Sequence, residues 1–419
     1  MKTLGERLIG FNKERLADMV KLKYQAMSEN IFRFYRGTNH IFYEDLAKYD
    51  LLPSSPLSWI SGDLHLENFG SFRSDNRLVY FDLNDFDEAL LAPCLFEVAR
   101  IVTSIFVAFD ALNIEQKRAL NMAELFIRTY AAKLAAGKPN YIEPQTAKGI
   151  VQEFLILASR QKQKAILRKR TGIRKKRLEI LLDDSRHLKL KRHLRAELFQ
   201  HITEWLKNDG DSPYNYKVVD GVFRLAGTGS LGVKRYAFLL KSLNKEGEKY
   251  LLIDMKQCVQ SSIAPFNSAL QPEWESEAHR VVNIQQRMQN RPPALLSTSI
   301  FNGECYVMQE MQPTKDSINL KKLKKEYRNM YQVIDDMAML TASSQLRTSG
   351  WRGSAIVDAL SAFAENEKWR APMLEYARDY SVQVRKYYME YLTDFQNGYF
   401  DRAIAGKHEN DEKLIEETA

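Results

Sequence analysis

Apolar residues recur every three to four positions over residues 11–49, in stretches such as "ERLADMVKLKYQAM", and this spacing predicts helices. Residues 57–83 instead hold short apolar runs separated by turn-forming residues, which predicts three strands. Residues 94–136 predict two apolar helices, and residues 145–207 predict further helices. We therefore expect the first half of the chain to be largely helical, with one small group of strands.

The pattern changes after "NDGDSPYNY", a loop rich in turn formers. Residues 216–257 predict a sheet of strands joined by Gly-containing turns, and Asn302–Gly303 predicts a further hairpin. Helical spacing returns over residues 273–289 and from residue 319 onward. The expected fold class is α+β, with three segments: a helical lobe over 1–215, a β lobe with one helix over 216–318, and helices over 319–419 that complete the helical lobe.

The composition is that of a globular protein with more than one core. The chain has 419 residues, of which 45% are hydrophobic and 27% charged, so two or three lobes are expected. The most apolar stretch, residues 89–112, contains Glu97, Arg100 and Asp110, which favours a buried helix over a membrane span. The oligomeric state cannot be predicted from these features.

The cysteines and the first residues indicate the compartment. Cys94, Cys258 and Cys305 lie far apart, which argues against a zinc site or a disulfide framework. The charged start of the chain lacks an uninterrupted apolar core, so we expect no secretory signal. A cytoplasmic location is the expectation.

Positive charge is concentrated in one segment. Residues 160–195 hold 15 Lys and Arg against three acids, a net +12, so the rest of the chain carries −4 of the total +8. One interpretation is a pair of amphipathic helices with solvated faces. The other is a surface that meets RNA, a membrane surface or an anionic substrate. The segment has no aromatic residue, which disfavours binding of single strands by base stacking.

The stretch "SGDLHLENFG" places Asp63 and Asn68 five residues apart in a polar loop between two predicted strands. This spacing fits a kinase catalytic loop, in which the Asp accepts or orients the proton of an attacking hydroxyl and the Asn reaches a magnesium ion. A polar surface turn is the alternative. His65, in the same loop, is expected to be a structural histidine that hydrogen-bonds to a carbonyl group or to Asp85.

A second group of polar residues follows the strand in "VYFDLNDFDEAL". Asp85 and Asp87 flank Phe86, so both carboxylates can face the same way. Clustered carboxylates repel one another unless a cation neutralises them, and Mg²⁺ prefers oxygen ligands. We expect Mg²⁺ to sit on Asn68 and Asp85 with help from Asp87, Asp85 being the main ligand of the two carboxylates. An acidic surface turn is the alternative.

The stretch "AGTGSLGVKRY" contains a G-x-G-x-x-G pattern, which serves both kinases and dinucleotide-binding folds. In a dinucleotide site a helix would follow the last glycine. Here the next residues predict a β-hairpin, which favours a Gly-rich turn folded over phosphates. The expected nucleotide-binding residues are Gly227, Gly229, Ser230 and Gly232. Asp254 could imitate the ribose-binding acid of a dinucleotide fold, so that interpretation stays open, as does an ordinary turn.

Three further positions complete the expected nucleotide site. Lys256 ends the strand "YLLIDMK", where it could grip phosphates. Its expected carboxylate partner is Glu277 on the next helix, with Glu275 as the alternate. Backbone groups of Glu310 to Gln312, after the strand in "YVMQEMQP", are expected to meet adenine.

These motifs resemble known families. "SGDLHLEN" is similar to the H-G-D-x-H-x-x-N loop of the protein-kinase-like superfamily, nearest its aminoglycoside- and choline-kinase branch, with Ser61 in place of the first His. "FRFYRGTN", "GDLHLENFG", "DLNDFDEA" and "YVMQEMQP" resemble the uncharacterised bacterial family catalogued as domain of unknown function 2252. The resemblance covers most of the chain.

The resemblance implies a two-lobed protein-kinase-like fold, with a large helical lobe and a smaller antiparallel β lobe. Kinases run from the Gly-rich loop to the catalytic loop, whereas this chain has the catalytic loop first, which implies a circular permutation. Glu97 looks like the buried acid that braces the catalytic loop in this superfamily. Arg36 could buttress Asp63 or a phosphate.

The expected function is an ATP- and Mg²⁺-dependent phosphotransferase acting on a hydroxyl of a small molecule. Asp63 would position the hydroxyl, and Lys256 with the Gly-rich turn would hold the phosphates. Two alternatives remain: an inactive nucleotide-binding pseudokinase scaffold, and a protein that binds RNA or an anionic surface through residues 160–195. Nucleic acid is the less favoured partner.

Overall fold

The computed structural model describes residues 2–405 apart from 161–162, 175, 184–185, 209–212, 214, 228, 230, 245–249 and 312–316. It is a mixed α+β structure, about half helical. The helices are α1 (Leu4–Phe11), α2 (Ala17–Ser28), α3 (Ile31–Gly37), α4 (Asn39–Leu46), α5 (Cys94–Ala111), α6 (Gln116–Ala135), α7 (Gly149–Arg160), α8 (Gln163–Arg170), α9 (Arg192–Asn208), α10 (Glu277–Met288), α11 (Leu320–Leu323), α12 (Tyr327–Arg347), α13 (Val357–Glu365) and α14 (Arg370–Gln396).

The strands form one large sheet and three two-stranded ones. Their bounds are β1 (Leu57–Ile60), β2 (Phe69–Arg73), β3 (Val79–Leu83), β4 (Leu90–Pro93), β5 (Thr171–Arg174), β6 (Arg177–Ile180), β7 (His187–Leu188), β8 (Tyr216–Arg224), β9 (Arg235–Ser242), β10 (Tyr250–Gln257), β11 (Ser297–Phe301) and β12 (Glu304–Glu310). The large sheet is antiparallel, in the order β11-β12-β10-β9-β8-β7. The expected Asn302–Gly303 hairpin is confirmed, and both residues have positive φ.

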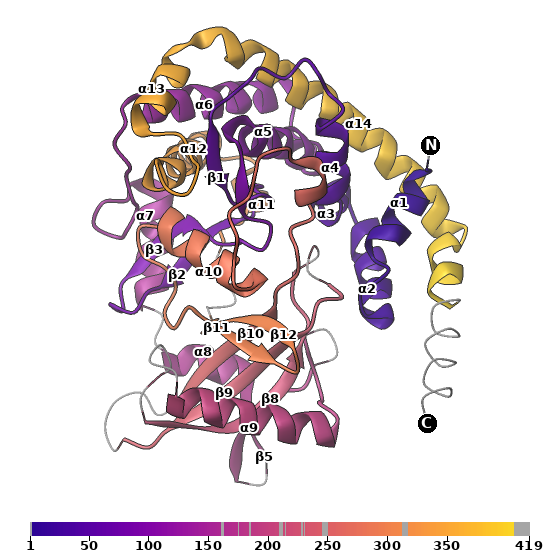
Figure 1. Cartoon of the computed structure of the whole chain (residues 1–419), viewed down its shortest axis with the longest axis vertical. Coiled ribbons are helices and arrows are strands. Elements are labelled where there is room, and N and C mark those ends of the chain that lie inside the picture. The colour runs from indigo at the N-terminus through magenta and orange to yellow at the C-terminus, as the bar shows by residue number, and fades with distance from the viewer. Residues whose placement is uncertain are drawn as a thin grey trace.

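Figure 1 shows the helices gathered at one end of the molecule and the large sheet, with α8 and α9, at the other. The helical part is built around α5, whose residues are nearly all buried and which packs against α3, α6, α14 and β1. Apolar residues on every side of a helix require such complete burial. The small strands β1, β2 and β3 lie at this end of the molecule. No helix among the described residues is long and apolar enough to cross a membrane.

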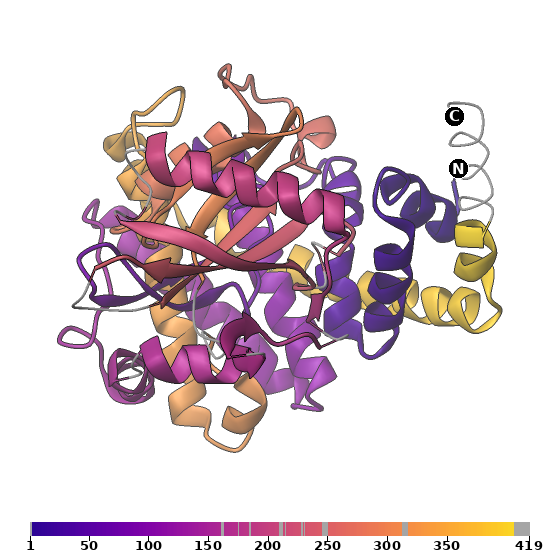
Figure 2. The same cartoon turned by 90° about the horizontal axis from the view of Figure 1, so that it is seen from below.

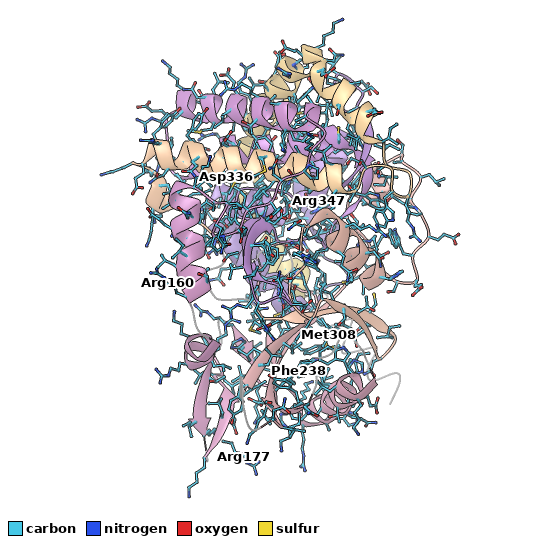
Figure 3. The ribbon with its side chains drawn as sticks, turned by 90° about the vertical axis from the view of Figure 1, so that its left-hand side faces the viewer. Arg160, Arg177, Phe238, Met308, Asp336 and Arg347 are labelled. Carbon is cyan, nitrogen blue, oxygen red and sulfur yellow. The ribbon has the colours of Figure 1, made fainter. Side chains whose placement is uncertain are left out.

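The two faces of the large sheet have different coverings. Tyr236, Phe238 and Leu240 of β9 pack with residues of α9, whereas Ala237 and Leu239, which alternate with them, pack in a second cluster on the other face. Figure 2 shows α9 lying across the sheet. In Figure 3, Arg177 lies at the end of the β5–β6 hairpin, at the opposite end of the molecule from Asp336 of α12. Lys256 lies on the other face of the sheet, the one that α9 does not cover.

The basic segment differs from its expected structure. Residues 160–195 were expected to form amphipathic helices of the helical lobe, but the described residues form α8, the β5–β6 hairpin and β7. Strand β7 extends the large sheet, and Ile180 and Leu190 enter its two clusters. This segment therefore buries apolar residues against the large sheet.

Candidate functional site

The loop between β1 and β2, residues 61–68, is held by buried hydrogen bonds. The backbone N–H and the hydroxyl of Ser61 both donate to Oε1 of Glu97 at 2.6 Å, and the Tyr43 hydroxyl donates to the Gly62 carbonyl at 2.6 Å. Glu97 is fully buried on α5, as expected for a brace of this loop. Gly62 has a φ of 87°, a conformation that other residues rarely adopt. The loop is therefore rigidly attached to the core of the helical part.

Asp63 projects from this loop and pairs with a buried arginine. Nη2 of Arg100 lies 2.8 Å from Oδ1 of Asp63, and the Arg100 side chain has no exposed surface. Burial raises the pKa of Asp63 to about 6, against the opposing effect of the Arg100 charge. A carboxylate with such a pKa is able to exchange a proton near neutral pH.

Asn68 connects this loop to Asp85 and Asp87, the two acids that follow β3 and that we call the acidic strand end. Its side-chain amide donates to the Asp63 carbonyl at 2.8 Å, and its own carbonyl accepts from the backbone N–H of Asn84 at 3.1 Å. Asp85 and Asp87 follow within three residues of Asn84, and Phe86 between them is buried. Asp63, Asn68, Asp85 and Asp87 all line one cavity of about 70 Å³. The structure thus brings together the residues that the sequence proposed for catalysis and metal binding.

Lys256 reaches the acidic strand end from the sheet. Its Nζ lies 3.6 Å from Oδ1 of Asp85 and forms a closer ion pair with Asp87. Burial alone would lower the pKa of Lys256, but the charges of Asp85 and Asp87 raise it. Lys256 is therefore cationic and partly neutralises the two carboxylates.

The expected pairing of Lys256 with Glu277 is wrong. Glu277 is the first residue of α10, and its carboxylate accepts from Nε of Arg280 at 2.6 Å. Residues three apart on a helix are neighbours on its surface, which explains this local pair. Arg280 in turn donates to the Asp87 carbonyl at 2.8 Å, so α10 supports the acidic strand end through Arg280.

The Gly-rich turn between β8 and β9 approaches the loop of Asp63 at Gly229. A methyl group on Gly229 would lie 3.9 Å from Oδ2 of Asp63. Gly227 and Gly232 have φ values of 75° and 98°, which require glycine. Ser230 lies outside the described residues. Strand β9 follows Gly232, as the hairpin interpretation required, so the dinucleotide interpretation is wrong.

Two cations near the N-terminus hold this turn and were not predicted. Nη1 of Arg15 donates to the carbonyls of Gly229 at 2.6 Å and Leu231 at 2.9 Å. Lys23, only 1% exposed, donates to the Gly229 carbonyl at 3.4 Å. Burial, with the charge of Arg15, lowers the pKa of Lys23 well below its ordinary value. Nothing in the sequence distinguishes these residues from other cations on amphipathic helices.

The sequence also did not predict the pairing of Arg100 with Asp63 or the partners of Arg36. Arg100 was visible as a charge within an apolar helix, and a buried charge requires a partner, but the sequence did not identify Asp63. Arg36 does not buttress Asp63. Its Nε donates to Nε2 of His65 at 3.1 Å, and it forms an ion pair with Glu67. His65 is buried, and its burial and the charge of Arg36 lower its pKa, which favours the neutral ring. Its ring hydrogen-bonds to Arg36 and to the Glu67 N–H, in place of the expected carbonyl group or Asp85.

The segment expected to meet adenine has its described amide donors already bonded. The N–H of Glu310 donates to the Ala294 carbonyl and that of Met311 to the Leu252 carbonyl, both at 2.8 Å. The Glu310 side chain pairs with Arg77 at 2.9 Å. Gln312 lies outside the described residues. These two N–H groups are therefore not available to a base.

The oxygen donors of the site fit a magnesium ion. Two carboxylates and an amide face one cavity, and Mg²⁺ is usually bound by one or two carboxylates together with substrate phosphates. No group of three or more His, Cys, Asp or Glu side chains within the described parts of the chain is arranged to hold a metal alone. A metal here would accordingly need phosphate oxygens to complete its coordination.

Comparison with known proteins identifies one family. The family model described as "Uncharacterized protein conserved in bacteria (DUF2252)" matches residues 15–394. No curated protein and no solved structure matches the chain. The matched range includes the loop of Asp63, the acidic strand end, the Gly-rich turn and Lys256.

Proposed function

The chain belongs to this bacterial family, DUF2252, and from the geometry of its site we propose that it is an ATP- and Mg²⁺-dependent phosphotransferase acting on a hydroxyl. The observation that carries the proposal is the convergence of four separate segments. The loop of Asp63, the acidic strand end and the Gly-rich turn line one cavity, and Lys256 reaches the same acids from the sheet. A pocket with convergent polar groups and a titratable residue of shifted pKa is the default hypothesis for a binding or active site.

Each residue has a distinct role in the proposal. Asp63, held by Arg100, orients the acceptor hydroxyl and takes its proton. Lys256 and the backbone of the Gly-rich turn bind phosphate oxygens. Asn68, Asp85 and Asp87 would hold Mg²⁺, which, when bound, neutralises charge on the transferred phosphate. Catalysis then comes from positioning and charge neutralisation.

The proposed fold is a permuted, two-lobed protein-kinase-like one. It is supported by the order of elements: β8, the Gly-rich turn, β9, the Lys256 strand β10, α10 and the hairpin β11–β12. In this chain that block follows the catalytic loop. The acceptor is proposed to be a small molecule, because the cavity beside Asp63 measures only about 70 Å³.

The proposal predicts nucleotide binding that requires a metal. A thermal-shift screen should show stabilisation by ATP with Mg²⁺, by about 2.7 kcal/mol when the ligand is at 100 times its Kd. Asp85→Ala should abolish this stabilisation, because it removes the main metal ligand. Asp50→Ala, at an exposed acid far from the cavity lining, is the matched control and should respond like the parent. No stabilisation by any nucleotide, with or without Mg²⁺, would contradict the proposal.

The raised pKa of Asp63 predicts the pH dependence of turnover. Asp63 accepts a proton only when ionised, so Mg²⁺-dependent ATP hydrolysis should decline as pH falls through about 6. Rates measured at saturating Mg²⁺ and ATP separate this titration from ligand binding. A rate that stays constant down to about pH 4.5, well below this pKa, would rule out Asp63 as the proton acceptor.

A pseudokinase scaffold remains the alternative if nucleotide binds without turnover. It predicts metal-dependent stabilisation by ATP together with biological function that survives Asp63→Asn. The RNA- or surface-binding alternative predicts salt-sensitive binding that neutralisation of residues 160–195 abolishes and Asp63→Asn leaves unchanged.

A further inference from the structure

A second, much larger hollow adjoins the site. This groove, of about 870 Å³, lies between the face of the large sheet that α9 does not cover and residues Ser71, Phe72 and Asn84, and residues of the basic segment also line it. Gly227 lines both the groove and the cavity of Asp63, so the two spaces meet at the Gly-rich turn. A ligand bound in the groove would therefore lie next to the cavity of Asp63.

The groove and the cavity carry opposite charge. Six cationic side chains line the groove against two acidic ones, Asp183 and Asp254. The cations are Arg33, Lys169, Arg170, Arg186, Arg224 and Arg235. The cavity instead holds Asp63, Asp85, Asp87 and Glu88 against three cations. An anionic ligand with a metal ion at one end matches this polarity.

The sheet side of the groove is a fixed ionic wall. Asp254 has a side chain only 1% exposed and lies 2.7 Å from Nη1 of Arg224 and 3.0 Å from Nε of Arg235. Burial alone would raise the pKa of Asp254, but these two arginines hold it well below its ordinary value. One carboxylate thus anchors two guanidinium groups. Guanidinium groups held in place suit phosphate oxygens.

A purine base is a poor match for this groove. Small-molecule pockets that hold flat rings are mostly apolar, with few polar groups. Here the lining includes the Arg224–Asp254–Arg235 cluster together with Arg33, Lys169 and Arg186. The observations therefore favour a chain of phosphate groups as the occupant.

We propose that the groove lined by Arg33, Lys169, Arg186 and the Arg224–Asp254–Arg235 cluster is a binding site for a chain of phosphate groups. This inference deepens the proposed function and rests on it only for the identity of the molecule that carries the chain. That molecule is either the nucleotide, through its own triphosphate, or a phosphorylated acceptor. The role of the basic segment is then to complete this groove.

The test uses inorganic tripolyphosphate as the probe on the full-length protein, by isothermal titration calorimetry without Mg²⁺. We expect tripolyphosphate to bind with a salt-dependent affinity and adenosine not to bind. The double variant Lys169→Ala/Arg186→Ala should weaken tripolyphosphate binding by about tenfold. The control Arg168→Ala/Arg177→Ala removes equal charge from exposed neighbours that do not line the groove, and should change the affinity less than twofold.

Competition with ATP identifies the source of the chain. Displacement of tripolyphosphate by ATP assigns the chain to the nucleotide, and simultaneous binding of both assigns it to a phosphorylated acceptor. Failure of tripolyphosphate to bind, an equal loss in the control pair, or displacement of ATP by adenosine would each overturn the inference. Tripolyphosphate binding should survive in Asp85→Ala. If the ATP and Mg²⁺ effect is absent while this binding persists, the proposed function fails and the groove assignment stands.

Discussion

Replacing Asp63 with asparagine should lower Mg²⁺-dependent ATP turnover by about 10²–10⁴-fold while ATP still stabilises the protein. The amide is close in shape to the carboxylate and can still accept a hydrogen bond from Arg100, which donates to Oδ1 at 2.8 Å. It cannot take a proton from the acceptor hydroxyl. The measurement is the rate of ATP hydrolysis, with thermal shift by ATP and Mg²⁺ as the parallel readout of binding.

Asp50→Asn makes the same chemical change at an exposed residue and should leave turnover unchanged. The stability of Asp63→Asn must be measured first, because the substitution leaves the Arg100 charge without its carboxylate. Turnover at the parental rate in a folded Asp63→Asn protein would contradict the proposed role. ATP binding without turnover in the parent itself would favour the pseudokinase scaffold.

Arg100→Met should destabilise the protein by about 3–5 kcal/mol, the range for removing one partner of a buried ion pair. The Arg100 side chain is fully buried, donates to the Tyr35 carbonyl at 2.9 Å and stacks 3.7 Å from the centre of the Tyr35 ring. Methionine fills similar space but leaves the Asp63 carboxylate, whose side chain is 18% exposed, without its counter-charge. Chemical denaturation would measure the loss in free energy of unfolding.

Arg118→Met on the following helix is the matched control, because that arginine is 44% exposed and its pair with Glu115 spans 4.0 Å. It should change stability by at most about 0.5 kcal/mol. In an Asp63→Asn background, Arg100→Met should cost clearly less, since the buried carboxylate is gone. Fully additive effects of the two substitutions would show that the ion pair is not the reason for the destabilisation.

The corrections to the site share one physical cause. Glu277 and Lys256 were expected to pair because both lie at suitable places in the order of motifs. Glu277 instead pairs with Arg280, one helical turn away, and Lys256 pairs with Asp85 and Asp87. Which charge neutralises which depends on the spatial approach of separate elements. Spacing along the chain constrains only partners on the same helix or strand.

The sequence by itself predicted most of the helices and strands, but not β4 or the strands β5 to β7, which lie in stretches expected to be helical. Helical and alternating periodicity identified the helical regions and the sheet, Asn302–Gly303 placed a hairpin, and the motifs around Asp63 and Asp85 marked the site. These features follow from backbone preferences and from residues close together in the chain. Only the tertiary structure decided that Arg100 pairs with Asp63, that Arg15 and Lys23 hold the Gly-rich turn, and that the basic segment joins the sheet. Each of these depends on where apolar faces pack, and packing brings residues together irrespective of their separation in sequence.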